Sequence, residues 1–284
     1  MAVNTNISNW IDRAESAIDY YSLFIKTWIP FNAWYMHNYY DDTSNPKRDT
    51  DAAIINHINS TTNIYRDKIK SLLRGSNESS VRFKLLLGKL HSALEANSIP
   101  DYENRISFST ICLSKNSFKT HSQSLKTFTY FVEFKDQYPK LTKRWFLEVQ
   151  KRSNNQTIHR VELFNWSLTE LQGNDDFNAI PEQEKRDQLR DAFQKINPKK
   201  PITIIIPPKI KRSNPTQPSN SIVIDPTINL YFTNDHDLVS KVIVQMIYEL
   251  RCKLFHGELN PNDANSHIYE FAYEIQKTLI KELN

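Results

Sequence analysis

The sequence predicts a mainly α-helical protein, in which the N- and C-terminal parts form an antiparallel helical bundle around an α+β insert. Apolar residues recur every three or four positions in long stretches near both ends of the chain. Between about residues 98 and 232 this periodicity gives way to short apolar runs of strand length. The predicted parts are therefore N-terminal helices at 1–97, an α+β insert at 98–232 and C-terminal helices at 233–284.

The composition indicates a packed globular protein of 284 residues, because it holds only 4 glycines and 12% aromatic residues. A net charge of +4 is compatible with an anionic partner without requiring one. The two cysteines, Cys112 and Cys252, give no disulfide framework and no zinc signature, so we expect no cofactor and no metal. The sequence shows no apolar stretch of about 20 residues and no signal-peptide pattern, which predicts a soluble cytoplasmic protein without a membrane segment.

Three helical stretches are predicted in the N-terminal part, at about 9–40, 49–75 and 78–96. Asn32 stands in the apolar stripe of the first stretch, where an unpaired buried amide would cost about 1–3 kcal/mol. Asn32 therefore needs hydrogen-bond partners. It either fixes the helix register, which we favour, or supports a functional site.

The insert contains strand-like runs at 128–134, 145–150 and 157–166, and Asn154–Asn155 is the expected hairpin turn between the last two. A charged helix is expected at 181–196, followed by short strands at 201–207, 221–224 and 229–232. Two basic runs, at 140–144 with 151–152 and at 199–200 with 209–212, are solvated faces or phosphate contacts, and we favour the former.

The C-terminal part predicts a helix capped by Asn234 or Asp235 that runs to about residue 255 and is ended by Gly257, and a last helix with Asn260 as its N-cap. Arg251 and His256 lie off the apolar stripe of the first of these helices. A histidine in a last helical turn complements the helix dipole, which is one interpretation of the pair. The other is that Arg251 and His256 face outward as a functional site.

The segment RCKLFHG, from Arg251 to Gly257, resembles the R-x4-6-H motif of the HEPN superfamily. The segment FIKTWIPFNAWY, residues 24–35, also resembles the first helix of several bacterial HEPN proteins. The resemblance implies a HEPN-like bundle, a homodimer and metal-independent RNase activity. Cys252 departs from the pattern, in which a polar residue often follows the arginine. Because a thiol is a poor hydrogen-bond partner, we expect Asn32 or another group to orient Arg251 and His256.

One arginine and one histidine suffice for RNA cleavage in which the 2′-OH of the RNA is the nucleophile. Histidine titrates near neutral pH and can accept the 2′-OH proton or protonate the leaving 5′-oxygen. An arginine can neutralise the charge that builds on the scissile phosphate. Each chain offers one such histidine, so a two-fold dimer would supply both the base and the acid.

We therefore expect a metal-independent HEPN-type endoribonuclease that cleaves single-stranded or tRNA-like RNA to 2′,3′-cyclic phosphate ends at a site shared by a homodimer. The resemblance further implies a toxin or antiviral defence effector with an inhibitory or activating protein partner. The expected catalytic residues are Arg251 and His256, supported by Asn32 and Cys252, with weaker RNA contacts from Lys253, Lys209, Lys211 and Arg212. The alternatives are a non-catalytic HEPN-like module that binds RNA, nucleotide or protein, and a structural interaction protein.

Overall fold

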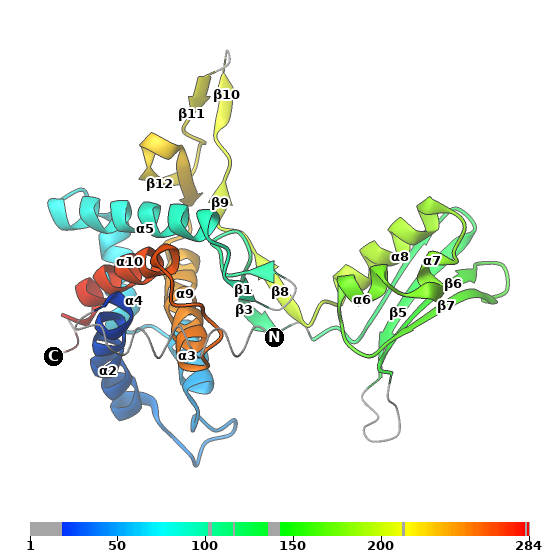
Figure 1. Cartoon of the computed structure of the whole chain (residues 1–284), viewed down its shortest axis with the longest axis horizontal. Helices are drawn as coiled ribbons and strands as arrows, with labels where there is room; N and C mark the ends of the chain where they lie inside the picture. Colours follow the sequence, from blue (N-terminus) through cyan, green and yellow to red (C-terminus); the bar gives the residue numbers. More distant parts are fainter. Residues whose placement is uncertain are drawn as a thin grey trace. The chain divides into compact units, whose positions relative to one another are not determined.

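The chain forms two compact units in a computed structural model (Figure 1). Unit 1 comprises Met1–Leu113 and Pro201–Asn284, and unit 2 comprises Ser114–Lys200. The structure describes residues 19–101, 104–115, 117–135, 143–211, 214–281 and 283. The first part of the helix expected at 9–40 lies outside the described residues, as does Arg212.

The fold is mixed α+β, so the expectation of a mainly α-helical, HEPN-like antiparallel bundle is wrong. Helices make up 49% of the structure and strands 23%, and the strands form several antiparallel sheets. Strands occur in both units, and one antiparallel sheet of unit 1 packs against its helices. Strands as short as two to five residues are too short to show a clear alternation in sequence.

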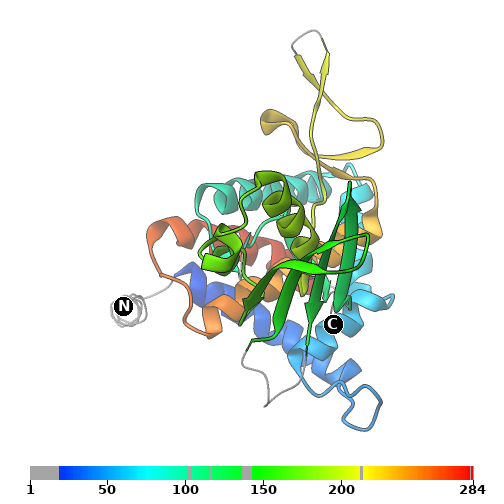
Figure 2. The same ribbon diagram turned by 90° about the vertical axis from the view of Figure 1, so that its right-hand side faces the viewer.

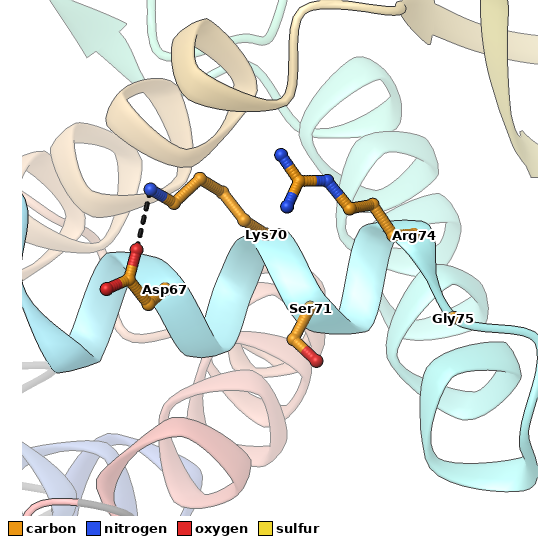
Figure 3. A pocket seen from close by; sticks show the side chains of 5 residues that line it. All are labelled: Asp67, Lys70, Ser71, Arg74 and Gly75. Carbon is orange, nitrogen blue, oxygen red and sulfur yellow. Dashed lines mark ion pairs between the residues drawn. The ribbon is translucent and has the colours of Figure 1, made fainter.

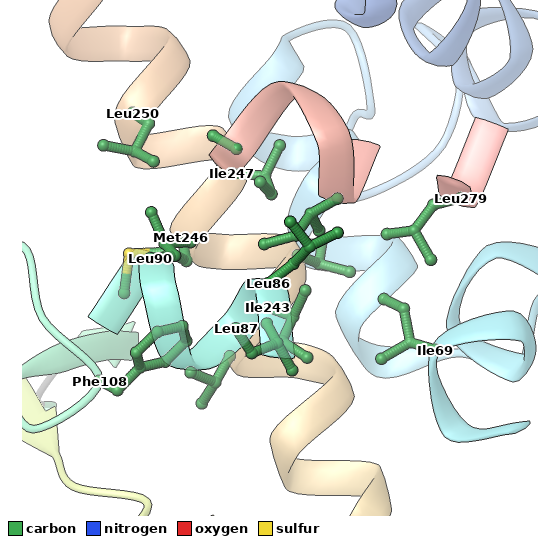
Figure 4. Close-up of a cluster of buried hydrophobic side chains, with 14 of the residues drawn as sticks. Ile69, Leu86, Leu87, Leu90, Phe108, Ile243, Met246, Ile247, Leu250 and Leu279 are labelled. Carbon is green, nitrogen blue, oxygen red and sulfur yellow. The ribbon is translucent and has the colours of Figure 1, made fainter. Parts of the chain in front are cut away.

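The helices of unit 1 pack around one apolar core. They are α2 (Tyr20–Tyr39), α3 (Asp51–Ser60), α4 (Ile64–Arg74), α5 (Glu78–Ala96), α9 (His236–Phe255) and α10 (Asp263–Ile280). Met246, Ile247 and Leu250 of α9 are buried, as are Leu87 and Leu90 of α5 (Figure 4). Helix α10 contacts both α2 and α5, while α9 contacts α4 and α3. Helix α9 thus belongs to the core on one side and carries Arg251 near its end.

The single helix expected at 49–75 is in fact two helices, α3 and α4. Asn63 is the N-cap of α4, and its side chain accepts a hydrogen bond from the backbone N–H of Arg66 at 3.0 Å. The Thr61 hydroxyl donates to the His57 carbonyl at 2.9 Å. Short polar side chains that bond to the nearby backbone compete with helix continuation, which explains the break.

The last helix also begins later than expected. The N-cap of α10 is Asn262, whose side chain accepts from the backbone N–H of Asn265 at 2.8 Å, and not Asn260. The predicted cap of α9 is correct, because Asp235 accepts from the N–H of Leu238 at 2.9 Å. Both caps satisfy N–H groups that the helix itself leaves unpaired.

Unit 1 also holds short strands and one 3-10 turn. These are β1 (Pro100–Asp101), β2 (Asn104–Arg105), β9 (Ile205–Ile206), β10 (Lys209–Lys211), β11 (Asn214–Thr216), β12 (Ser221–Asp225), η1 (Pro226–Ile228) and β13 (Leu230–Thr233). The antiparallel sheet β12-β13-β9 adds Ile222 and Phe232 to the helical core. The β10–β11 hairpin projects from this unit (Figure 1). Residues 98–113 and 201–232 of the expected insert therefore belong to unit 1. Strands β3 (Ile111–Lys115) and β8 (Lys199–Ile202) form a two-stranded sheet.

Unit 2 is a four-stranded antiparallel sheet with helices on one face (Figures 1 and 2). The strands are β4 (Thr120–Leu125), β5 (Phe128–Phe134), β6 (Trp145–Lys151) and β7 (Thr157–Leu163), in that order across the sheet. The helices are α6 (Leu168–Gln172), α7 (Asp175–Asn178) and α8 (Gln183–Lys195). Val132, Leu147 and Val161 of the sheet share a second core with Leu189 and Phe193 of α8. None of the helices in the described part of the chain is long and apolar enough to cross a membrane.

Candidate functional site

Arg251 and His256 lie at the C-terminal end of α9 in different environments. The Arg251 side chain is half-buried, with 19% of its surface exposed. His256 is the C-cap residue, and its side chain is exposed. Its backbone N–H donates to the Cys252 carbonyl at 3.0 Å, and Gly257 follows with φ +65°. Gly257 thus ends the helix as expected, and His256 is open to solvent.

Asp51, the first residue of α3, fixes the position of Arg251. Its Oδ2 atom lies 2.9 Å from Nη2 of Arg251. The guanidinium also lies over two rings, with 4.3 Å to the centroid of Phe255 and 5.5 Å to that of Trp28. One carboxylate and two aromatic faces therefore restrict the planar arginine head.

Asn32 and Tyr35 extend this arrangement into a hydrogen-bond network. Nδ2 of Asn32 donates to the Tyr35 hydroxyl, and that hydroxyl donates to Oδ1 of Asp51 at 2.8 Å. The network therefore runs from α2 through α3 to α9 and ends at Arg251. Asn32 does not contact Arg251 in this network, and its link to the arginine passes through Tyr35 and Asp51.

Two neighbouring groups are held in their neutral forms. Burial, with the hydrogen bond to Asp51 as a further cause, raises the pKa of the Tyr35 hydroxyl. Tyr35 therefore remains a hydrogen-bond donor throughout the physiological pH range. Burial also raises the pKa of the Cys252 thiol, which is hydrogen-bonded with Tyr248. A protonated thiol is a weak nucleophile, so Cys252 is a packing residue beside Arg251.

The lysines predicted to contact RNA do not gather around Arg251. Lys253 is largely buried, and its Nζ lies 2.6 Å from Glu258 and 4.0 Å from Asp101. Lys209 and Lys211 are exposed on the β10–β11 hairpin, where Lys209 donates to Ser219 at 2.6 Å. The structure thus brings Asn32, Cys252 and Arg251 into one region, and His256 is exposed at the C-cap of α9, five residues after Arg251.

Asp51 is the member of this site that the sequence analysis missed. An acidic residue in the first turn of a helix is common, because it complements the helix dipole, and this role hides any pairing with a distant residue. Tyr35 fitted the apolar stripe of the first helix, which gave no sign of its hydroxyl's partners. Only the packing of α2 and α3 against α9 shows the network.

A pocket of about 480 Å³ lies elsewhere in unit 1, along α4 (Figure 3). It is lined by Asp67, Lys70, Ser71, Arg74 and Gly75. Lys70 pairs with Asp67 at 2.6 Å. Nearby, Lys84 donates to the Gly75 carbonyl at 2.9 Å, and Arg74 stands in the last turn of α4. These cations complement the negative end of the helix dipole, so we assign them to the stability of α4.

Within the described ranges, no three His, Cys, Asp or Glu side chains come together as a metal ion would require. No known protein family, no curated protein and no solved structure matches this chain. The arguments about function below therefore rest on the residues and their geometry.

Proposed function

We propose that the protein is a metal-independent endoribonuclease of the HEPN type that acts at Arg251 and His256. The observation that carries this proposal is the network that ends at Arg251. Asn32, Tyr35 and Asp51 hold the guanidinium in one orientation, and the exposed His256 follows five residues later at the end of the same helix. A pre-positioned cation lowers the barrier for charge that develops on a phosphate, because little reorganisation is needed during the reaction.

The chemistry requires one base and one acid. The 2′-oxygen of the RNA attacks phosphorus as a base removes its proton, and the P–O5′ bond breaks as an acid protonates the 5′-oxygen. The products are a 2′,3′-cyclic phosphate and a 5′-OH end. Asp51 holds Nη2 of Arg251, so a phosphate oxygen would accept from another N–H group of the guanidinium.

A homodimer would bring the second histidine. Phe255 lies directly before His256 and contacts Arg251, yet 51% of its surface is exposed. In such a dimer the second chain would cover this ring, since aromatic residues are enriched in subunit interfaces. The role as a toxin or antiviral effector in the cytoplasm, with a regulatory protein partner, rests on the HEPN resemblance.

A non-catalytic binding module is the second candidate, and one observation favours it. Asp51 neutralises much of the charge of Arg251, whose side chain is only 19% exposed. A neutralised guanidinium stabilises a transition state less than a free one does. The same residues would then hold RNA, a nucleotide or a protein without cleaving anything.

Cleavage of labelled single-stranded RNA in the presence of EDTA separates the two candidates. We expect the wild-type chain to leave 2′,3′-cyclic phosphate ends and His256→Ala to lose about 10²–10⁴-fold in rate. His267→Ala is the matched control, because His267 is also exposed, pairs with Glu270 on α10 and should not affect the rate. Cleavage that persists in His256→Ala, or that requires added Mg²⁺, would refute the proposal. RNA binding without cleavage would favour the second candidate.

A further inference from the structure

A second pocket lies in unit 2, at the end of the sheet where two hairpin turns meet. It has a volume of about 490 Å³ and is lined by Lys126, Thr127, Phe128, Lys151, Arg152 and Ser153. We call it the hairpin pocket. Its volume falls in the range of small-molecule sites, about 300–1,000 Å³, and is large enough for one nucleotide.

Hydrogen bonds join the two turns that form the hairpin pocket. The backbone N–H of Arg152 donates to the Thr127 carbonyl at 2.9 Å, and Nη1 of Arg152 donates to the Lys126 carbonyl at 3.1 Å. Phe128 and Lys151 are direct cross-strand partners in β5 and β6. The pocket is therefore built into the sheet and does not depend on a loose loop.

The hairpin pocket is positively charged. Lys126 pairs with Glu184 at 2.7 Å, but both side chains are more than half exposed, so this pair is weak. Lys151 is exposed, and neither it nor Arg152 has a carboxylate partner among the residues that the structure describes. Two unneutralised cations beside a third form a suitable place for a phosphate group.

The pocket also has an aromatic wall. Phe128 is half-buried, and Nζ of the buried Lys185 lies 4.2 Å from its ring centroid on the side of α8. The ring is thus held by the second core and by Lys185, while its remaining surface lines the pocket. A fixed aromatic ring surrounded by cations is the usual arrangement for stacking a base and holding its phosphate.

The backbone at Lys126 is unusual. Its φ angle is 54°, and the other described non-glycine residues with positive φ are Asn155, Asn220 and Asn229. Asparagine tolerates this conformation, whereas lysine adopts it less readily. The two-residue turn between β4 and β5 requires a positive φ at its first position, so the turn fixes the place of Lys126 in the pocket lining.

The open face of the same sheet does not fit this chemistry. Glu133, Glu148 and Glu162 share it with Lys135 and Arg160. Lys135 lies 3.1 Å from Glu133, and Arg160 lies 2.8 Å from Glu162 and 3.6 Å from Glu148. Lys135 and Arg160 are thus already paired with carboxylates, so they are less suited to a phosphate than the cations of the hairpin pocket. Anion binding in unit 2 is therefore expected at the hairpin pocket.

We propose that the hairpin pocket binds a nucleoside phosphate, with Lys126, Lys151 and Arg152 on the phosphate and Phe128 against the base. The ligand is either one nucleotide of a single-stranded RNA or a free nucleotide. This site lies in unit 2 and is distinct from the Arg251–His256 pair. It gives unit 2 a binding role that does not depend on RNA cleavage.

The test uses the full-length chain with the His256→Ala substitution, so that its result is independent of cleavage. A fluorescently labelled ten-nucleotide oligouridylate is titrated with this protein, and anisotropy gives the affinity. We expect Lys151→Glu to weaken binding at least tenfold and to reduce the salt dependence by about one phosphate contact. Phe128→Leu, which retains an apolar side chain, should weaken binding about tenfold through lost stacking.

Lys200→Glu is the charge-matched control, since Lys200 is exposed in the same unit but lies outside the pocket, and it should bind like the parent chain. Lys151→Gln provides a second variant if Lys151→Glu does not fold.

Competition with uridine monophosphate distinguishes the two ligand sources. Displacement of the oligouridylate by a low concentration of uridine monophosphate would show that the pocket binds free nucleotides. If the oligouridylate stays bound, the pocket binds RNA. Equal binding by the Lys151 and Lys200 variants, or equal competition by inorganic phosphate and by the nucleotide, would overturn the proposal.

Discussion

Arg251 shows how a single residue can be oriented by groups far from it in sequence. Its head is fixed by Asp51, which Tyr35 and Asn32 in turn hold from α2. The sequence indicated Arg251, His256 and the need for a partner of Asn32. It could not indicate Asp51, because nothing in the 199 residues between Asp51 and Arg251 relates the two before folding.

Asp51→Asn removes the negative charge and keeps the shape of the side chain. We expect the variant to lose about 1–2 kcal/mol of stability, because a hydrogen bond to a charged group is lost in a partly buried position. RNA cleavage should fall as well, since Arg251 is less well oriented. Urea unfolding gives the first quantity and the RNA assay the second. Asp42→Asn, at an exposed loop position, is the control. Unchanged stability and unchanged activity in Asp51→Asn would show that the network has no such role.

The contribution of Asp237 to the unfolding free energy should depend on pH in a direction that its pKa shift predicts. A hydrogen bond from Lys241 and the nearby Arg66 guanidinium lower the pKa of its carboxyl group. The ionised Asp237 carboxylate therefore stabilises the folded protein above the ordinary aspartate pKa of about 4. This contribution to the unfolding free energy is lost as pH falls through the lowered pKa. The difference in unfolding free energy between wild type and Asp237→Asn should be largest near neutral pH and shrink in acid. A difference that grows in acid would contradict the assignment.

At the scale of elements, long periodic stretches were predictable and short polar breaks were not. The helix at 78–96 and the strand at 128–134 agree with α5 and β5. The break between α3 and α4 was missed, because the hydrogen bonds of the Asn63 and Thr61 side chains to the backbone do not alter the spacing of the apolar residues. Strand β9 has two residues, which is too few for any alternation to be recognised.

Gly88 explains one apparent conflict between sequence and structure. Glycine in a helix interior costs about 1 kcal/mol relative to alanine, yet Gly88 lies inside α5. A Cβ atom at this position would lie 2.8 Å from Cβ of Asp225, at the end of β12. The glycine thus permits the close approach of α5 and β12.

Gly88→Ala should therefore destabilise the protein, although alanine favours helices. We expect a net loss of about 1–3 kcal/mol, the usual cost of overpacking. Thermal unfolding measures the effect. Ser92→Ala, at an exposed position on the same helix, is the control and should leave stability almost unchanged. A Gly88→Ala variant more stable than wild type would show that α5 and β12 do not approach as described.

At the scale of the whole molecule, the mixed α+β fold was not predictable from the periodic ends of the chain. The hairpin of β6 and β7 was apparent from its strand runs and from Asn155, which has φ 55°. The assignment of β12, β13 and β9 to the helical unit was not apparent, because it depends on Ile222 and Phe232 reaching a core built by distant helices. Pairing across such sequence distances is set by packing and not by local pattern.

The proposed catalytic unit is a dimer in which each chain supplies one histidine. A His256→Ala chain should fold and dimerise, since the side chain is exposed and such changes usually cost within about 0.5 kcal/mol. Mixed dimers would then have one histidine instead of two. Loss of one acid or base lowers the rate by about 10²–10⁴-fold, so mixed dimers should be nearly inactive.

The most direct measurement is RNA cleavage at a fixed amount of wild-type chain, unfolded and refolded together with increasing amounts of His256→Ala chain. The account predicts that activity falls with the surviving fraction of wild-type dimers, while refolding with His267→Ala chain does not lower it. Activity that stays constant as His256→Ala is added would mean that each chain works alone, and the shared site would be wrong.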